Sequence, residues 1–142
     1  MTELTLKQAD CIIDGALAKA RELDTAPMAA IVLDSGGNIV AFKREDGASI
    51  MRFKIAQAKA WGSIGMLMSS RKMAEMAETR PAFVSALGEM SGGKIAPSPG
   101  SVLIEDHQGE LLGAIGVSGD LPDLDEQCSY AGTESSDCKL RE

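Results

Sequence analysis

Two glycine-containing polar turns, each lying between a pair of apolar segments, constrain the fold of this chain more than any other feature. Residues 34–38 have the sequence DSGGN and separate the apolar segments 28–33 and 39–44. Glycine and asparagine favour the backbone conformations of tight turns, so this pattern predicts a β-hairpin. The turn at residues 106–109, sequence DHQG, predicts a second hairpin in the same way.

The second hairpin contains one of the longest apolar runs of the chain. Residues 111–117 are apolar throughout, whereas a strand with one face in water alternates apolar and polar residues. This run therefore predicts a central strand that is covered on both faces. Because the strands are joined as hairpins, the sheet is predicted to be antiparallel.

Helical spacing of apolar residues predicts the two longest helices. Thr5 and Gln8 form a capping box before a segment whose apolar residues recur every three or four positions as far as Leu23. A second helix is predicted to begin near Ser49. The predicted core side of that helix comprises Phe53, Ala56, Ala60, Ile64 and Leu67.

Shorter helices are predicted in the second half of the chain. Ser70 is expected to cap a helical segment over residues 71–77, and Pro81 suits the first position of the next helix. Asp123 and Glu126 have the spacing of a capping box for the last helix. Helices packed on an antiparallel sheet make an α+β fold.

The chain is predicted to form a single domain. Its 142 residues and mass of 14.9 kDa suit one hydrophobic core, and no repeat or low-complexity linker divides the sequence. We expect residues 1–134 to form this domain and residues 135–142 to be a polar C-terminal tail that frays.

Charge and hydropathy exclude several classes of function. The chain carries 21 acidic and 14 basic residues, a formal net charge of −7, which argues against nucleic acid or an anionic membrane as a partner. No apolar run approaches the roughly 20 residues that span a bilayer. The first residues, Met1 to Leu4, lack the basic region of a signal peptide.

The cysteines and the histidine favour a cytoplasmic protein without a metal site. Cys11, Cys128 and Cys138 are an odd number and include no CxxC pair, so we interpret them as reduced thiols. His107 is the single histidine and lies in a predicted turn. A zinc site or a Ser-His-Asp triad therefore has few residues available, and no metal is expected.

A candidate site is predicted where the apolar strand ends. Gly116, Ser118 and Gly119 could present backbone N–H groups to a ligand, although strand glycines more often allow close packing. Asp125 and Glu126 follow within a few residues and point to different sides of a helix. Each could orient a ligand or exchange a proton, although acidic residues at a helix start more often cap it.

Two basic residues complete this predicted site. Arg44 leaves the second strand of the first hairpin, and Lys59 lies seven positions after Arg52 on one stripe of the second long helix. Arg44 and Lys59 could hold a small carboxylate between them, so an anionic ligand is expected. The competing interpretation is that Lys59 and the acidic residues only pair to hold helices together.

Several blocks of this sequence resemble the GlcG/HbpS-like haem-binding family. They are Asp34-Ser35-Gly36-Gly37, Arg44-Glu45-Asp46-Gly47-Ala48, Ile55-Ala56-Gln57-Ala58-Lys59-Ala60 and Gly113-Ala114-Ile115-Gly116-Val117-Ser118-Gly119, followed by Asp125-Glu126. The resemblance covers nearly the whole chain, from about Leu4 to Gly132, and also includes the C-terminal part of PduO-type proteins. One departure is Ser101, which stands where the family commonly has a second glycine after Gly100.

The resemblance implies a fold, an assembly and two alternative functions. It implies a profilin-like domain with a five-stranded antiparallel sheet that assembles into a homo-oligomer. The first function is binding of haem or a related cofactor. The alternative is a small lyase or isomerase acting on an oxo-acid or aldehyde, in which Lys59, Asp125 and Glu126 would be catalytic. With one histidine, haem ligation would fall to methionine, cysteine or tyrosine.

Overall fold

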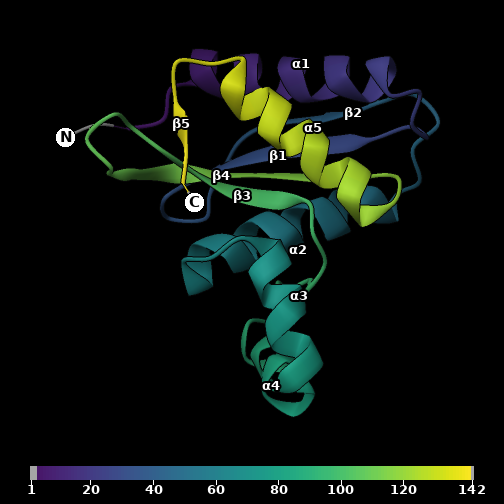
Figure 1. Cartoon of the computed structure of the whole chain (residues 1–142), viewed down its shortest axis with the longest axis vertical. Coiled ribbons are helices and arrows are strands. Elements are labelled where there is room, and N and C mark those ends of the chain that lie inside the picture. Colours follow the sequence, from purple (N-terminus) through teal and green to yellow (C-terminus); the bar gives the residue numbers. More distant parts are fainter. Residues whose placement is uncertain (1–2, 142) are drawn as a thin grey trace.

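An antiparallel sheet with helices on both faces forms the structure, as the sequence predicts (Figure 1). It is a computed structural model that describes residues 3–141. The elements in chain order are α1 (Leu6–Glu22), β1 (Ala29–Asp34), β2 (Ile39–Arg44), α2 (Met51–Met66), α3 (Ser70–Thr79), α4 (Pro81–Met90), β3 (Ser101–Glu105), β4 (Leu111–Ser118), α5 (Pro122–Glu134) and β5 (Lys139–Leu140).

The sheet has the strand order β2-β1-β4-β3-β5, and every pairing is antiparallel. Both predicted hairpins are present, as β1–β2 and β3–β4. The apolar strand β4 lies at the centre between β1 and β3 and is buried over all but its first residue. The five-stranded α+β fold implied by the family resemblance is therefore confirmed.

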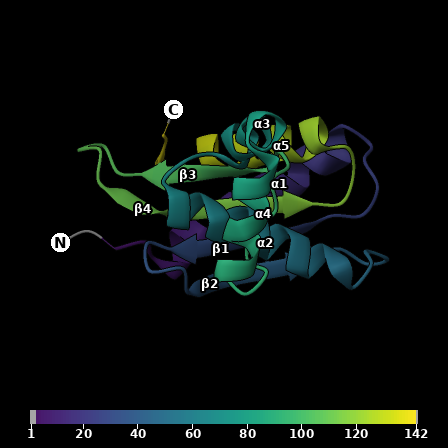
Figure 2. The ribbon, with the colours of Figure 1, turned by 90° about the horizontal axis from the view of Figure 1, so that it is seen from below.

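The two faces of the sheet carry separate apolar clusters. Helices α1 and α5 cover one face, where Ile12, Ile13, Val32 and Ile115 are fully buried. Helix α2 covers the other face with a smaller cluster that contains its Ala56 and Ala60. Helices α3 and α4 extend from the α2 side away from the sheet (Figure 1). Figure 2 shows α4 from its outer side, in front of α2 and the sheet.

Glycine in β4 allows α2 to lie directly on the strand. A Cβ atom on Gly116 would overlap the backbone carbonyl of Ala56 in α2 and would lie 3.0 Å from the Cβ of Ala60. Gly116 therefore allows close packing of α2 on β4. Close packing is also the more common role of strand glycines, compared with presenting N–H groups to a ligand.

The structure confirms two of the predicted helix starts and contradicts others. The capping box of Thr5 and Gln8 is present, and Pro81 occupies the first turn of α4. The Ser70 cap is wrong: Ser69 is the N-cap and accepts a hydrogen bond from the Lys72 backbone, while the Ser70 hydroxyl accepts one from the Ser101 N–H at 2.8 Å. That backbone N–H lies on the outer side of β3 and needs a partner.

The second predicted capping box is also wrong. Helix α5 has Leu121 at its N-cap and no side-chain cap. Asp123 and Glu126 instead both bind the guanidinium of Arg71. A charge-assisted hydrogen bond is stronger than a neutral one, so both carboxylates serve Arg71 instead of the helix end.

Leu67 does not join the core, contrary to its predicted position on the core side of α2. Helix α2 ends at Met66, and Leu67 adopts the left-handed conformation with φ of 54°. The N–H of Met68 then reaches back to the carbonyl of Ser63 at 3.1 Å, which closes the helix end. The side chain of Leu67 is 63% exposed as a result.

The predicted fraying of the C-terminal tail is wrong for the residues that form β5. Leu140 is the register partner of Ile104, and Lys139 that of Glu105, at the outer edge of β3. The Arg141 backbone N–H continues this pairing to the carbonyl of Leu103 at 3.0 Å. Polar composition suggested an unattached tail, but the free edge of β3 supplies hydrogen-bond partners for it.

Candidate functional site

Lys59 and Asp125, both predicted as site residues, form a buried ion pair at one end of the sheet. Lys59 comes from α2 on one face and Asp125 from α5 on the other. The Nζ atom of Lys59 lies 3.0 Å from Oδ2 of Asp125, and the two side chains are 3% and 2% exposed. Lys59 also donates to the carbonyl of Val117 at 3.1 Å. The pair therefore joins the helical layers around the end of β4.

Gly100 provides the space through which the lysine passes. It has φ of 140°, and a Cβ atom there would lie 2.7 Å from Nζ of Lys59. Oδ1 of Asp125 accepts the backbone N–H of Asp120 at 3.0 Å. Burial lowers the pKa of Lys59 and raises the pKa of Asp125, although the attraction between the two charges opposes both shifts. The pair is thus buried, and backbone hydrogen bonds hold both of its members.

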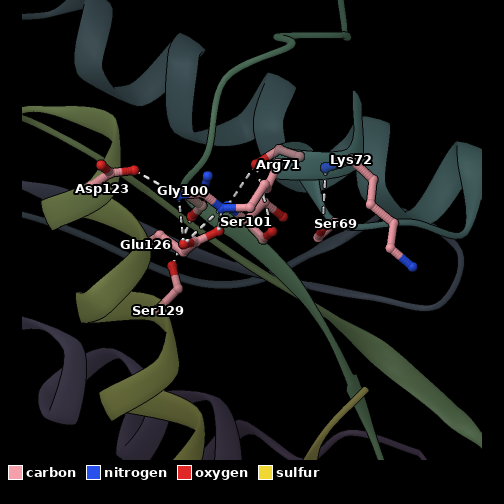
Figure 3. A network of polar contacts seen from close by, with 9 residues as sticks. Ser69, Arg71, Lys72, Gly100, Ser101, Asp123, Glu126 and Ser129 are labelled. Carbon is pink, nitrogen blue, oxygen red and sulfur yellow. Dashed lines mark hydrogen bonds and ion pairs between the residues drawn. The ribbon is translucent and has the colours of Figure 1, made fainter. Parts of the chain in front are cut away.

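Glu126 points to a different side of α5, as its spacing from Asp125 predicts. Its carboxylate accepts hydrogen bonds from Nε of Arg71 at 2.9 and 3.1 Å (Figure 3). The same guanidinium donates to Asp123 at 2.6 Å. The hydrogen bonds that Arg71 donates to Glu126 and Asp123 raise the pKa of its guanidinium above the ordinary value. Arg71 therefore connects α3 to α5 as a fixed cation.

The remaining predicted site residues lie around the end of the sheet. Ser118 is buried and accepts a hydrogen bond from Arg52 at 3.2 Å, and Gly119 packs so closely that a Cβ atom would overlap the sulfur of Met28. Arg44 is exposed and lines a different cavity, together with Arg21 and Glu45. The structure thus brings Lys59 together with Asp125, whereas Arg44 lines a separate cavity.

His107 and Cys128 occupy the surroundings that the sequence predicts. His107 is exposed in the β3–β4 turn, and its Nε2 lies 2.8 Å from the backbone oxygen of Asp137. Cys128 is fully buried, and burial raises the pKa of its thiol to about 11. Of the methionines at 66, 68, 73 and 76, Met73 is buried in full, while the others keep part of their surface.

A cavity beside α3 was not predicted from the sequence. It has a volume of about 460 Å³, within the usual size range of small-molecule sites, and lies between the α2–α3 turn, α3, the outer edge of β3, α5 and β5. We call it the α3–β5 cavity. Its lining residues are Leu67, Met68, Ser69, Arg71, Lys72, Glu75, Val102, Leu103, Tyr130, Glu134, Leu140 and Arg141.

The lining of the α3–β5 cavity combines an apolar wall with polar groups and charges of both signs. The thioether of Met68 and the phenol of Tyr130 belong to the side-chain types that ligate haem iron. Lys72 and Arg141 are cations of this lining, but Arg141 is paired with Glu105, and the acidic residues Glu75 and Glu134 also line the cavity. Lys72 extends away from the Arg71 network (Figure 3). The only sequence signal for this site was the group of methionines, because its walls come from distant segments.

A second cavity lies on the other side of Arg71. It has a volume of about 570 Å³ and is formed by α3, Pro99 and the start of α5, including Leu121 and Asp123. It lies close to the predicted place for a ligand at the acidic helix start. Three of its lining residues are acidic, namely Glu75, Glu78 and Asp123, which disfavours an anionic ligand.

Metal-ligand clusters and membrane-spanning helices are both absent from residues 3–141. In this part of the chain no three side chains of histidine, cysteine, aspartate or glutamate cluster as metal ligands would. No helix among these residues has the length and apolar character needed to cross a membrane.

The fold is an α+β domain with a five-stranded antiparallel sheet, and a cavity of about 460 Å³ lies at the edge of that sheet. Residues 4–134 match the family described as haem degrading protein HbpS-like, and the chain belongs to that family. No curated protein sequence matches it.

Solved structures share the fold. The PduOC structure, solved as a haem complex, is 18% identical with a TM-score of 0.88 over 99% of this chain and 100% of that chain. A double mutant of HbpS from Streptomyces reticuli is 25% identical with a TM-score of 0.81 over 94% and 87%. The ORFY protein of Klebsiella pneumoniae is 21% identical with a TM-score of 0.84 over 95% and 92%.

Proposed function

We propose that this protein binds haem or a chemically related planar cofactor. The observation that carries the proposal is membership of the HbpS-like family over residues 4–134. A protein of the same fold was solved as a haem complex, which supports haem as the cofactor. Haem would supply a redox-active iron, and the thioether of Met68 in the α3–β5 cavity is a side-chain type that could ligate it.

The first test is a hemin titration followed by absorbance. We expect saturable binding with an open, weakly ligated spectrum, because His107 lies in an exposed turn and is the only histidine. A His107→Ala variant is expected to bind hemin within about twofold of the parent affinity. A sharp low-spin spectrum that disappears in His107→Ala would contradict this assignment.

We also propose that the protein is a homo-oligomer that acts in the cytoplasm as an accessory protein of small-molecule catabolism. The oligomer is supported by exposed apolar side chains on and near α2 and α4, including Ile50, Met51 and Met90 at 79%, 53% and 72% exposure. Helix α4 packs mainly on α3. All three cysteines are free thiols, which suits a reducing compartment.

The mass in solution tests this assembly. Light scattering coupled to size exclusion at micromolar concentration is expected to give a multiple of the 14.9 kDa chain mass. A Met90→Glu variant places a charge on the exposed end of α4 and is expected to shift the population toward smaller species. A parent protein that elutes only as the monomer would contradict the proposal.

The enzymatic alternative is supported less well. It requires a substrate to reach Lys59 and Asp125, but these side chains are 3% and 2% exposed and are bound to each other. Gly116 and Gly119 are likewise enclosed by α2 and by Met28. Binding of a cofactor in a separate cavity needs no such rearrangement.

A further inference from the structure

We infer that helix α4 of one copy of this protein docks in the groove between α3 and the start of α5 of a second copy. The existence of a second copy rests on the homo-oligomer proposed above. The location of the contact rests on three observations: an uncovered apolar face on α4, an apolar groove beside α3, and opposite charges around the two.

Helix α4 exposes an apolar face that the rest of its own chain does not cover. Apolar residues at spacings of three or four positions share one side of this helix, namely Ala82, Phe83, Ala86, Leu87 and Met90. The first, third and last of them are exposed, and the other two are half-buried. Helix α4 packs mainly on α3, and of its residues only Val84 is buried. An apolar face of this width is typical of a helix that packs against a further surface.

The cavity of about 570 Å³ between α3 and the start of α5, which we call the α3–α5 groove, is such a surface. Apolar side chains from three separate stretches of the chain line it, namely Ala74, Pro99, Leu121, Pro122 and Leu124. Leu121 is 67% exposed, so its apolar surface is available for contact. Grooves of this kind commonly bind one apolar face of a helix, with residues at spacings of three and four as anchors.

The rim of the α3–α5 groove is acidic. Glu75 and Glu78 lie on its α3 wall, and the ion pairs of residues 3–141 include neither of them. The one arginine of the lining, Arg71, is already paired with Asp123 and Glu126. The groove therefore favours a partner that brings a positive charge beside an apolar surface.

Helix α4 has that combination. Arg80 directly precedes it and stacks on the ring of Phe83 at 4.1 Å, and no ion pair within residues 3–141 contains this arginine. Residues 80–94 carry two basic side chains and one acidic side chain, whereas the whole chain has a net charge of −7. Opposite charges at the rim of a contact select its partner and fix its register.

Both halves of this contact lie on the same chain, so two copies can satisfy it reciprocally. Helix α3 forms one wall of the groove and also carries α4, and the two helices extend away from the sheet (Figure 1). In a dimer with twofold symmetry, each copy places its α4 in the groove of the partner and receives the partner's α4 in its own. A second copy is therefore the occupant that the apolar surfaces and the charges support.

The test compares two charge-reversal variants of the full chain, alone and mixed, by light scattering coupled to size exclusion. Arg80→Glu places a carboxylate against the acidic groove, and Glu75→Lys with Glu78→Lys places ammonium groups against Arg80. Each variant alone is expected to associate about tenfold or more weakly, because like charges then face each other. In an equimolar mixture the contacts between unlike chains again join opposite charges, so the parent mass is expected to return. Misfolding of the single variants could not produce this rescue.

Lys54→Glu is the matched control, because it reverses the charge of an exposed residue of α2 outside the groove and α4. It is expected to keep the parent mass. If the control dissociates the oligomer and the α4 and groove variants do not, the interface lies at the start of α2 and the inference is overturned. Variants that keep the parent mass, or that mixing does not rescue, also overturn it, while the proposed oligomer stands. A monomeric parent overturns both, and a hemin titration of the same sample tests the proposed cofactor separately.

Discussion

A Lys59→Met variant is expected to lose about 3–5 kcal/mol of unfolding free energy, because it leaves the buried carboxylate of Asp125 without its partner. The pair is 3% and 2% exposed, so water cannot replace the lost ammonium group. Urea denaturation followed by circular dichroism measures the loss. Lys54→Met is the matched control, since Lys54 is an exposed residue of the same helix and is expected to change stability by less than about 0.5 kcal/mol.

The loss of unfolding free energy in Lys59→Met is expected to depend on pH. Burial already raises the pKa of Asp125, and removing Lys59 removes the attraction that opposes this shift. A group whose pKa is raised on folding stabilises the folded state at low pH and loses that contribution as the pH rises through the folded value. The stability deficit should therefore be smaller near about pH 4 than near about pH 8.

A double variant tests whether Lys59 has a structural role or belongs to a ligand site. Lys59→Met with Asp125→Leu is expected to recover most of the lost stability, because replacing both ions by apolar groups removes the unpaired charge. If Lys59→Met instead melts like the parent and loses hemin binding, Lys59 belongs to the ligand site that the sequence suggested.

Gly116→Ala is expected to destabilise the protein by about 1–3 kcal/mol through overpacking. The added methyl group would overlap the Ala56 carbonyl, so α2 must move away from β4. Gly88→Ala is the matched control in α4, where a Cβ atom meets nothing within 4 Å. It should raise stability by roughly 0.5–1 kcal/mol, because alanine favours the helix. Equal effects of the two substitutions on the thermal midpoint would show that α2 does not pack on β4 as described.

Most of the fold was predictable because its signals are local. The turn at residues 34–38 lies between strands that pair directly, and the apolar run of β4 reports burial on both faces. The errors are at positions where a distant partner decides the outcome. Asp123 and Glu126 have the spacing of a cap, but Arg71 is 52 and 55 positions away. Strand β5 depends on the edge of β3, which composition does not report.

The candidate site was predicted only in part. The sequence predicted Lys59 and Asp125 as residues of one site, with their pairing as the competing interpretation, and the structure pairs them with each other. It did not indicate the α3–β5 cavity, whose walls come from four separate stretches of the chain. The left-handed conformation of Leu67 was also missed, because a leucine in a periodic apolar pattern predicts continued helix.

The short strand β5 affects how this protein should be labelled and purified. Leu140 and Arg141 form part of the cavity wall, so a purification tag or fluorescent reporter fused directly after Arg141 would start at that wall. Such a fusion could obstruct ligand entry or pull β5 away from β3. A fusion before α1 avoids this problem, because α1 contributes no side chain to that wall. Affinity measurements should therefore use tags placed before α1, with no fusion after β5.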